Sequence, residues 1–292
     1  LAASVRPQTI IATNTSYLSI AAIAEASSHP EHVLGLHFFS PAEIMKLVEV
    51  VRYDKADHAD LAAVTAFARR LGKLPIQASD SFGFIGNRIY AAYRRQAEFL
   101  VEEGAAPEEV DAALEEFGFA MGPFAVTDLS GLDIAWRMRR SQDATRPATE
   151  RYVTIADRLV ELGRLGRKSG AGWYVYREDG KRAPDLLVRT RRQIEASDIV
   201  CRCLAAILNE AALIIAEGVC QRASDIDLVL VNGYGFPKHE GGPVFWMSGQ
   251  PADEIARGQA EIAAAGGSEF RRGDLELLSP DRNSPGRAGK ST

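Results

Sequence analysis

The chain has 292 residues and a net charge of −5, with 46% hydrophobic and 25% charged residues. This composition is typical of a globular protein with two or three domains, and without a basic stripe it argues against nucleic acid or anionic membranes as main partners. The longest apolar runs, 204–208 and 211–216, are separated by Asn209 and Glu210, so we expect no membrane span. Three cysteines build no disulfide framework and no signal-peptide pattern is present, so we expect inert thiols and a cytoplasmic location.

The first part of the chain, residues 1–79, alternates strand and helix signals. Short apolar or β-branched runs predict strands at 8–13, 33–39, 45–51 and 75–79, and periodic apolar positions predict helices at 19–26 and 60–71. In the second of these helices, the buried face is expected to comprise Leu61, Val64, Phe67, Ala68 and Leu71. Strands that alternate with helices indicate part of an α/β sheet.

Longer helical segments follow Phe82. Helices are predicted at 87–103, 107–117 and 151–165, before a stretch rich in glycine and tyrosine at 166–176 and a charged linker at 178–184. Pro107 and the two glutamates after it suit the first turn of the second helix, because proline tolerates that position and acidic groups complement the helix dipole.

A second helical block resembles the first. The segment QAEFLVEEG at 96–104 parallels EAALIIAEG at 210–218, and Glu109–Asp111 has a counterpart in Asp225–Asp227. Both blocks finish on a Gly-Pro-aromatic element, at 122–124 and 242–245. A duplicated all-α module explains this repeat most simply.

The strongest candidate for chemistry is the run GLHFFSP at 35–41, followed by KLVEV at 46–50. His37 ends an apolar strand next to a turn, where α/β sheets present ligand-facing side chains. Glu49 lies among apolar, mostly β-branched residues, and an ionised carboxylate there needs a partner. A hydrogen bond from the His37 imidazole would supply one and would raise the basicity of its outer nitrogen, as suits a general base for an alcohol. The alternative left open is a core histidine beside an edge-strand charge.

Two further polar clusters are candidates. Asn14-Thr15-Ser16 follows the first predicted strand, where it fits either a ligand contact or an N-cap for 19–26. Asn87 lies where the α/β and helical parts join, and it fits a cap, a hinge or a polar contact in a cleft between domains. No HExxH or Cys/His spacing indicates a metal site, and no GxGxxG dinucleotide fingerprint is present.

Five segments, in order and spacing, resemble the L-3-hydroxyacyl-CoA dehydrogenase family. They are ATNTSYLSI (12–20), GLHFFSPAEIMKLVEVV (35–51), DSFGFIGNRI (80–89), MGPFAVTDLSGLD (121–133) and LGRKSGAGWYVY (165–176). The segment NGYGFPKHEGGPVFW (232–246) is similar to the end of the multifunctional β-oxidation proteins, in which an enoyl-CoA hydratase domain precedes the dehydrogenase and the helical domain is duplicated.

The resemblance implies an α/β plus all-α fold, with a partial Rossmann-type nucleotide domain before a duplicated helical domain. The expected domains are the C-terminal portion of the NAD-binding domain at 1–79, a first helical dehydrogenase domain at 80–180, and a second helical repeat at 181–278. The tail at 279–292 is rich in Pro, Gly and Ser and is predicted to be disordered. The implied partners are an acyl-CoA substrate and an upstream hydratase domain, and a homo-oligomer is left open.

The resemblance also implies the reaction, the oxidation of L-3-hydroxyacyl-CoA to 3-ketoacyl-CoA by NAD⁺ in fatty acid β-oxidation. His37 would remove the 3-hydroxyl proton while hydride passes to NAD⁺, and Glu49 would orient and support the imidazole. Ser16 and Asn87 would hydrogen-bond the substrate near the reacting carbon. Ser16 would also approach the nicotinamide, and Lys168 would lie near the cofactor.

Three features depart from the family pattern. Ser40 stands where the family usually has an asparagine that helps bind the cofactor, and Gln96 replaces a glutamate. The glycine-rich NAD loop and the acidic residue for the ribose are missing from this sequence, so we expect the chain alone to be inactive. A non-catalytic helical scaffold or dimerisation fragment is therefore the alternative function. A dehydrogenase of small hydroxy acids is a third, which the spacing of HFFxP and KLVEV disfavours.

Overall fold

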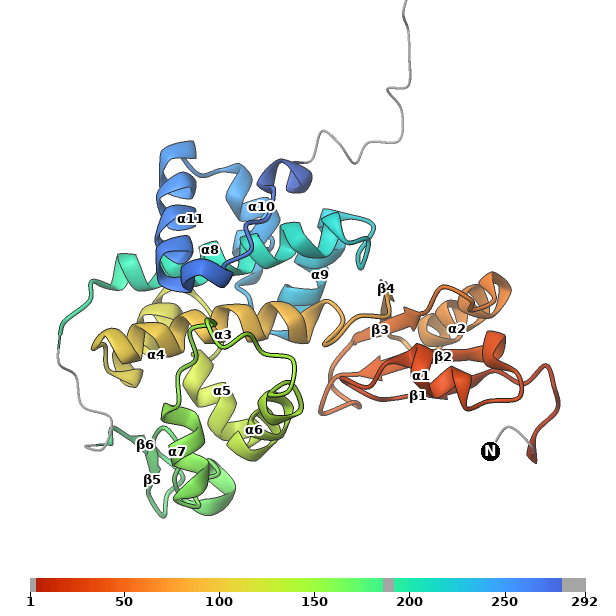
Figure 1. Cartoon of the computed structure of the whole chain (residues 1–292), viewed down its shortest axis with the longest axis horizontal. Coiled ribbons are helices and arrows are strands. Elements are labelled where there is room, and N and C mark those ends of the chain that lie inside the picture. The colour runs from red at the N-terminus through yellow and green to blue at the C-terminus, as the bar shows by residue number, and fades with distance from the viewer. Residues whose placement is uncertain (1–3, 186–191, 280–292) are drawn as a thin grey trace, which may run out of the picture. The chain divides into compact units, whose positions relative to one another are not determined.

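The computed structural model describes residues 4–185 and 192–279 (Figure 1). The chain divides into two compact units. The first unit comprises Leu1–Tyr90, Leu208–Gly249 and Gly273–Thr292, and the second comprises Ala91–Ile207 and Gln250–Arg272. These limits differ from the three domains expected from the sequence, which stay a prediction. Residues 280–292 of the predicted disordered tail lie outside the described residues.

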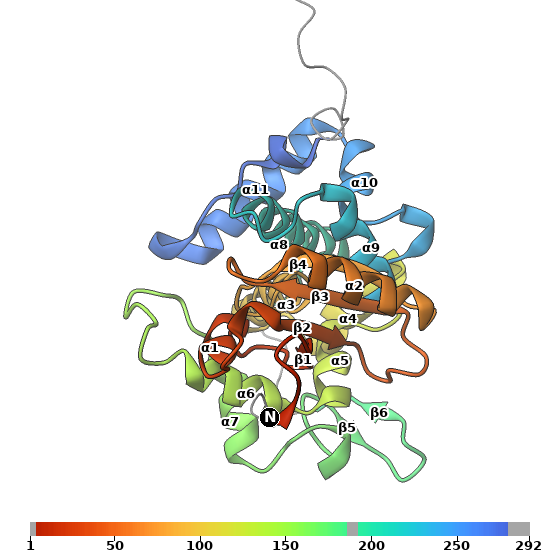
Figure 2. The ribbon, with the colours of Figure 1, turned by 90° about the vertical axis from the view of Figure 1, so that its right-hand side faces the viewer.

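The first unit contains a mixed four-stranded sheet in the order β1-β2-β3-β4 (Figure 2). Its strands are β1 (Ile11–Thr13), β2 (Val33–Phe38), β3 (Leu47–Arg52) and β4 (Leu74–Ser79). The outer pairs run parallel, whereas β2 and β3 run antiparallel. All four predicted strands are thus present, but β1 is shorter than expected because the Thr9 N–H donates to the Arg6 carbonyl in a turn. The two middle strands are buried along almost their whole length, which explains their continuous apolar runs.

Two helices of the first unit cover this sheet. Helix α1 (Ile20–Glu25) packs against β2, and α2 (His58–Arg70) packs against β3 and β4. Each begins at a residue whose side chain accepts a backbone N–H of the first turn, Ser19 for α1 and Asp57 for α2.

The predicted buried face of α2 was wrong in part. Leu61, Val64 and Ala68 are buried, but Phe67 is 43% exposed and Leu71 is 50% exposed. At 100° per residue, position 67 lies about 120° around the helix from position 61 and outside the buried face, whereas Thr65 lies about 40° from position 61 and is buried.

The remaining part of the first unit comes from late in the chain. It includes α9 (Ala223–Gly233), η4 (Lys238–Glu240), α10 (Pro243–Ser248) and η6 (Leu275–Leu278). The backbone N–H and side-chain hydroxyl of Ser79, at the end of β4, donate to the carbonyls of Val219 and Gly218. Arg88 pairs with Glu210 and Glu217 at 2.5 and 2.6 Å. These contacts tie residues 208–219 to the sheet and to the start of α3 (Gly86–Glu103).

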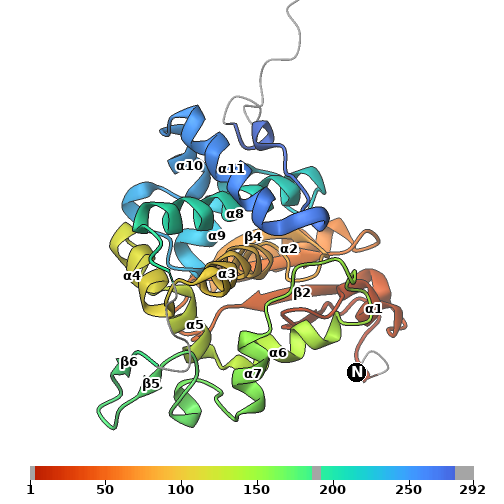
Figure 3. The same ribbon diagram turned by 60° about the vertical axis from the view of Figure 1, so that its left-hand side comes forward.

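The second unit is mostly helical (Figure 3). It contains α4 (Pro107–Phe117), α5 (Pro123–Ser130), α6 (Leu132–Ser141), α7 (Ile155–Glu161), η3 (Arg167–Ser169), β5 (Val175–Tyr176), β6 (Arg182–Ala183), α11 (Ala252–Gly266) and η5 (Gly267–Glu269). Helix α4 has the predicted limits, α3 begins one residue early, and α5 and α6 were not predicted. The helix predicted at 151–165 was too long, because α7 ends at Glu161 and Gly163 turns the chain at φ 75°.

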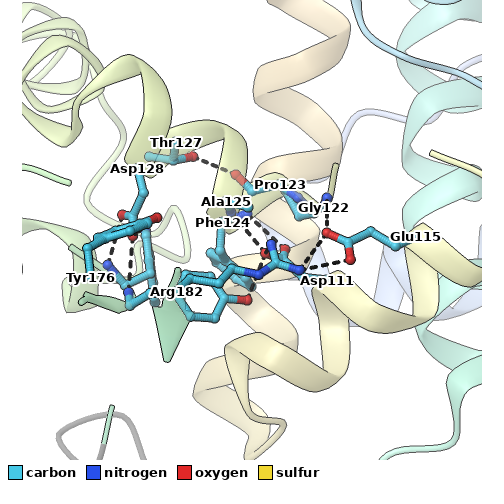
Figure 4. A network of polar contacts seen from close by, with 12 residues as sticks. Asp111, Glu115, Gly122, Pro123, Phe124, Ala125, Thr127, Asp128, Tyr176 and Arg182 are labelled. Carbon is cyan, nitrogen blue, oxygen red and sulfur yellow. Dashed lines mark hydrogen bonds and ion pairs between the residues drawn. The ribbon is translucent and has the colours of Figure 1, made fainter. Parts of the chain in front are cut away.

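Two buried carboxylates organise the second unit (Figure 4). Asp111 accepts hydrogen bonds from the backbone N–H groups of Phe124 and Ala125 at the start of α5, and from the Tyr174 hydroxyl. Asp128, on α5, accepts the N–H groups of Trp173 and Tyr174. Burial raises the pKa of Asp111 to about 6, against the lowering effect of its donors. Because backbone groups occupy both carboxylates, we assign them a structural role.

The first unit repeats this device. Asp227 accepts the N–H groups of Val244 and Phe245 at the start of α10, as Asp111 does at the start of α5. In both places a glycine precedes the proline that opens the short helix, and a Cβ on Gly122 or Gly242 would lie 2.3 Å from the aspartate side chain. This correspondence at the predicted positions supports the proposed duplication.

Among the described residues, one helix is long and apolar enough to cross a membrane by length and composition, namely α8 (Ala196–Ala216). Length and composition alone do not contradict the sequence prediction of no membrane span. Within the fold, 72% of its most apolar window is buried, as is common for a core helix.

Candidate active site

The central feature of the candidate site is the buried carboxylate of Glu49. This residue lies in the middle of β3 and is 0% exposed. One oxygen accepts the Nδ1 hydrogen of His37 at 2.8 Å, and the other accepts the backbone N–H groups of Ile85 and Gly86 at 3.1 and 3.0 Å. Three donors around one carboxylate satisfy its charge where water is excluded. The hydrogen bond predicted between His37 and Glu49 is present.

Sheet register brings the two side chains together. His37 and Glu49 are direct partners across the antiparallel pair β2–β3, so their side chains lie on the same face. Because Glu49 accepts from Nδ1, a neutral His37 carries its proton there and leaves Nε2 as the unprotonated, basic nitrogen. The Ser16 hydroxyl lies 3.1 Å from that Nε2. A hydroxyl group thus already stands where an alcohol would deliver its proton.

The two backbone donors to Glu49 come from a constrained turn before α3. Gly83 and Phe84 both have positive φ values, 77° and 50°. Among the described residues, Phe84 is the only one other than glycine whose φ is positive. A phenylalanine in left-handed backbone is strained, and it persists where its surroundings hold it. The Phe84 ring is fully buried, with its centroid 5.7 Å from that of His37. The strained turn therefore aims the N–H groups of Ile85 and Gly86, at the start of α3, at Glu49.

Asn87 occupies the first turn of α3, directly after Gly86. Its Oδ1 accepts a hydrogen bond of 2.8 Å from the Tyr234 hydroxyl, which comes from the end of α9. With Oδ1 engaged, the amide nitrogen is the group that Asn87 has left to offer to a substrate oxygen. The sequence did not identify Tyr234, and the segment 232–246 that contains it was recognised only by resemblance.

The two remaining predicted site residues take part in none of the contacts described above. Ser40 is exposed, two residues beyond the end of β2. Lys168 belongs to the second unit, where its ammonium group forms an ion pair with Asp133. Their cofactor-binding roles stay predictions.

Cysteine chemistry and metal binding receive little support. Burial raises the pKa of the Cys203 and Cys220 thiols to about 12 and also raises the pKa of Cys201, so all three are protonated near neutral pH. Within residues 4–185 and 192–279, no three His, Cys, Asp or Glu side chains are grouped so as to hold a metal ion. A histidine base supported by a carboxylate is the chemistry that these residues offer.

Two family models match the chain. Residues 1–81 match the NAD binding domain of 3-hydroxyacyl-CoA dehydrogenase, and residues 83–176 match its C-terminal domain. The matches meet at the turn that supplies the backbone donors to Glu49.

Known proteins align over most of the chain. The peroxisomal bifunctional enzyme of Homo sapiens is 42% identical over 85% of this chain, and the fatty acid oxidation complex subunit alpha of Vibrio vulnificus is 36% identical over 92%. The chain spans 38% and 39% of their respective lengths. The crystal structure of 3-hydroxybutyryl-CoA dehydrogenase from Escherichia coli has a TM-score of 0.76 at 27% identity, covering 93% of this chain and 75% of that one.

Proposed function

Because the chain belongs to the 3-hydroxyacyl-CoA dehydrogenase family, we propose that it oxidises L-3-hydroxyacyl-CoA to 3-ketoacyl-CoA with NAD⁺, as a step of fatty acid β-oxidation. The observation that carries the proposal is the pair formed by His37 and Glu49, with Nε2 of the imidazole facing a hydroxyl group. The names of the relatives, which refer to fatty acid oxidation and to 3-hydroxybutyryl-CoA, support the substrate class.

The proposed reaction assigns each residue a task. His37 Nε2 takes the proton of the substrate 3-hydroxyl group while the hydrogen on C3 leaves as hydride, so that the C–O bond becomes a carbonyl. Glu49 stabilises the resulting imidazolium through the Nδ1 hydrogen. Ser16 and Asn87 hold the substrate oxygens in line with the imidazole. Bound NAD⁺ supplies the hydride acceptor.

The described residues fit only part of such a cofactor. Ser16 follows β1 and lies beside His37, a position that suits the reacting end of a dinucleotide beyond the carboxyl ends of the strands. The pyrophosphate normally binds a glycine-rich turn between a strand and a helix. Among the residues that the structure describes, no such turn bears that fingerprint, and the expectation that this chain alone is inactive stays a prediction.

The setting of this activity is also a proposal. Relatives named bifunctional enzyme and oxidation complex subunit support a second activity in the same polypeptide, for which an enoyl-CoA hydratase domain is the expected class. The cytoplasmic location expected from the sequence remains open, since some of the relatives are named peroxisomal.

The test is a dehydrogenase assay on the protein encoded by the complete reading frame that contains these residues. NADH formation from 3-hydroxyacyl-CoA of several chain lengths is followed by absorbance. We expect His37→Gln to lower kcat by about 10²–10⁴, the usual contribution of a positioned general base, with a much smaller change in KM. His239→Gln is the matched control, because that histidine has a 70% exposed side chain and takes no part in the site.

The outcomes separate the proposal from its alternative. Turnover that survives in His37→Gln would remove the assigned base. A folded wild-type protein without NAD-linked turnover on any chain length would favour the non-catalytic scaffold.

A further inference from the structure

Tyr234 makes contact with the candidate site from a distant part of the sequence. It follows directly after α9, and its hydroxyl group donates to Asn87 Oδ1 across 147 positions of sequence. Both residues belong to the first compact unit, together with His37 and Glu49.

The ring of Tyr234 contacts two supports of the dyad. It lies against Gly86, where an added Cβ would stand 2.3 Å from Tyr234 Cε2, and the Gly86 N–H is one of the donors to Glu49. It also packs edge-on against Phe39, with ring centroids 5.6 Å apart, and the Phe39 ring packs on His37 with centroids 4.7 Å apart. One side chain thus supports the amide, the carboxylate donor and the imidazole.

We infer that Tyr234 is a positioning residue for the proposed dehydrogenase reaction, fixing the Asn87 amide so that its nitrogen donates to the acyl-CoA oxygen. An asparagine side chain presents either its oxygen, which accepts hydrogen bonds, or its nitrogen, which donates them, to a ligand. A phenol that donates to Oδ1 selects one of these orientations. The inference rests on the proposed function, because it assigns Asn87 to an oxygen of the substrate.

The second helical block therefore contributes to the site through one hydroxyl group and one ring. Substrate oxygen atoms are hydrogen-bond acceptors, so an amide held with its nitrogen outward binds them without first reorienting. Loss of the hydroxyl group leaves the ring contacts in place and frees the amide to turn. The expected loss is that of a single hydrogen bond, about 2- to 12-fold in kcat/KM.

A double-mutant cycle tests this inference in the complete protein. Tyr234→Phe, Asn87→Ala and the double variant are assayed for kcat/KM with 3-hydroxyacyl-CoA and, by calorimetry, for affinity toward a 3-ketoacyl-CoA. We expect Tyr234→Phe to lower both quantities by about 2- to 12-fold in the wild-type background and to have no further effect in Asn87→Ala. Melting temperatures are measured alongside, because a merely structural hydroxyl would change stability without this dependence on Asn87.

Tyr53→Phe is the matched control. Tyr53 belongs to the same unit, and among the described residues its buried hydroxyl has no hydrogen-bond partner. Its removal should leave kcat/KM unchanged in both backgrounds. Equal losses from Tyr234→Phe with and without Asn87 would overturn the inference and leave the proposed function standing. A wild-type protein without turnover would refute the proposed function, whereas the binding cycle would still decide the role of Tyr234.

Discussion

Both carboxylate oxygens of Glu49 accept hydrogen bonds, so its replacement by glutamine is informative. A glutamine at this position would keep its oxygen toward the N–H groups of Ile85 and Gly86 and turn its amide nitrogen toward His37. That nitrogen donates to Nδ1, so the proton of the neutral imidazole moves to Nε2, where the base must be free. We expect Glu49→Gln to lower kcat by about 10²–10⁴ with little change in KM.

The measurement is steady-state turnover with a saturating 3-hydroxyacyl-CoA, beside a circular dichroism spectrum that shows the fold is kept. Glu43→Gln is the control, since Glu43 is an exposed carboxylate in the loop between β2 and β3. A kcat within a factor of about three of wild type would mean that the tautomer of His37 does not matter to turnover.

At the scale of residues, a contact could be predicted from the sequence where one residue required a partner and a nearby segment supplied it. A glutamate inside an apolar strand required a buried partner, and a histidine on a neighbouring strand supplied one. Tyr234 escaped prediction because its partner lies 147 positions away and nothing in a Gly-Tyr-Gly turn specifies what the ring will meet. The positive φ of Phe84 also escaped, because sequence patterns assign such backbone to glycine.

The start of helix α3 offers a test at the scale of an element. Alanine normally favours a helix over glycine by about 1 kcal/mol. At position 86, however, a Cβ would stand 2.3 Å from Tyr234 Cε2 and 2.8 Å from its hydroxyl oxygen. We therefore expect Gly86→Ala to destabilise the protein by about 1–3 kcal/mol, as overpacking does, and to lower kcat/KM by displacing Tyr234.

The control is the same substitution in a Tyr234→Ala background, where the obstructing ring is gone. There Gly86→Ala should be neutral or stabilising when unfolding is followed in urea. An equal destabilisation in both backgrounds would show that the glycine serves the backbone of the turn and not the ring.

Element limits were predictable where local signals were strong. Helix α4 has the predicted limits because Pro107 opens it and Gly118, at φ 121°, closes it. Helices α5 and α6 were missed because long-range contacts define them: Asp111 bonds the first N–H groups of α5, and Leu132, which opens α6, bonds the Leu165 carbonyl. Composition gives no sign of such partners.

At the scale of the whole molecule, the buried aspartates make stability depend on pH. Burial raises the pKa of Asp111 to about 6, from an ordinary value of 3.8. Between these values the folded state binds more protons than the unfolded state, so stability falls as the pH rises. We expect the unfolding midpoint of the wild type, relative to Asp111→Asn, to fall as the pH rises from about 4 to 7.

Asp133 provides a control with the opposite sign. The hydrogen bond from Lys168 holds the pKa of the Asp133 carboxyl below its ordinary value. Its contribution to stability is therefore present above pH 4 or so and is lost as the pH falls. Denaturation curves of Asp111→Asn and Asp133→Asn at several pH values decide the matter, and a parallel dependence in both variants would contradict the assigned pKa of Asp111.

The distance in sequence between Asn87 and Tyr234 also has a consequence for synthesis. The ribosome releases the histidine, the glutamate and the asparagine first, and the tyrosine that bonds the amide comes 147 residues after Asn87. A growing chain contains every residue assigned to the proposed reaction before it contains Tyr234, which positions Asn87. A premature stop or a proteolytic cut ahead of Tyr234 leaves a fragment with the recognisable signature of a dehydrogenase but without that support. The proposed site is therefore complete only after Tyr234 has been translated.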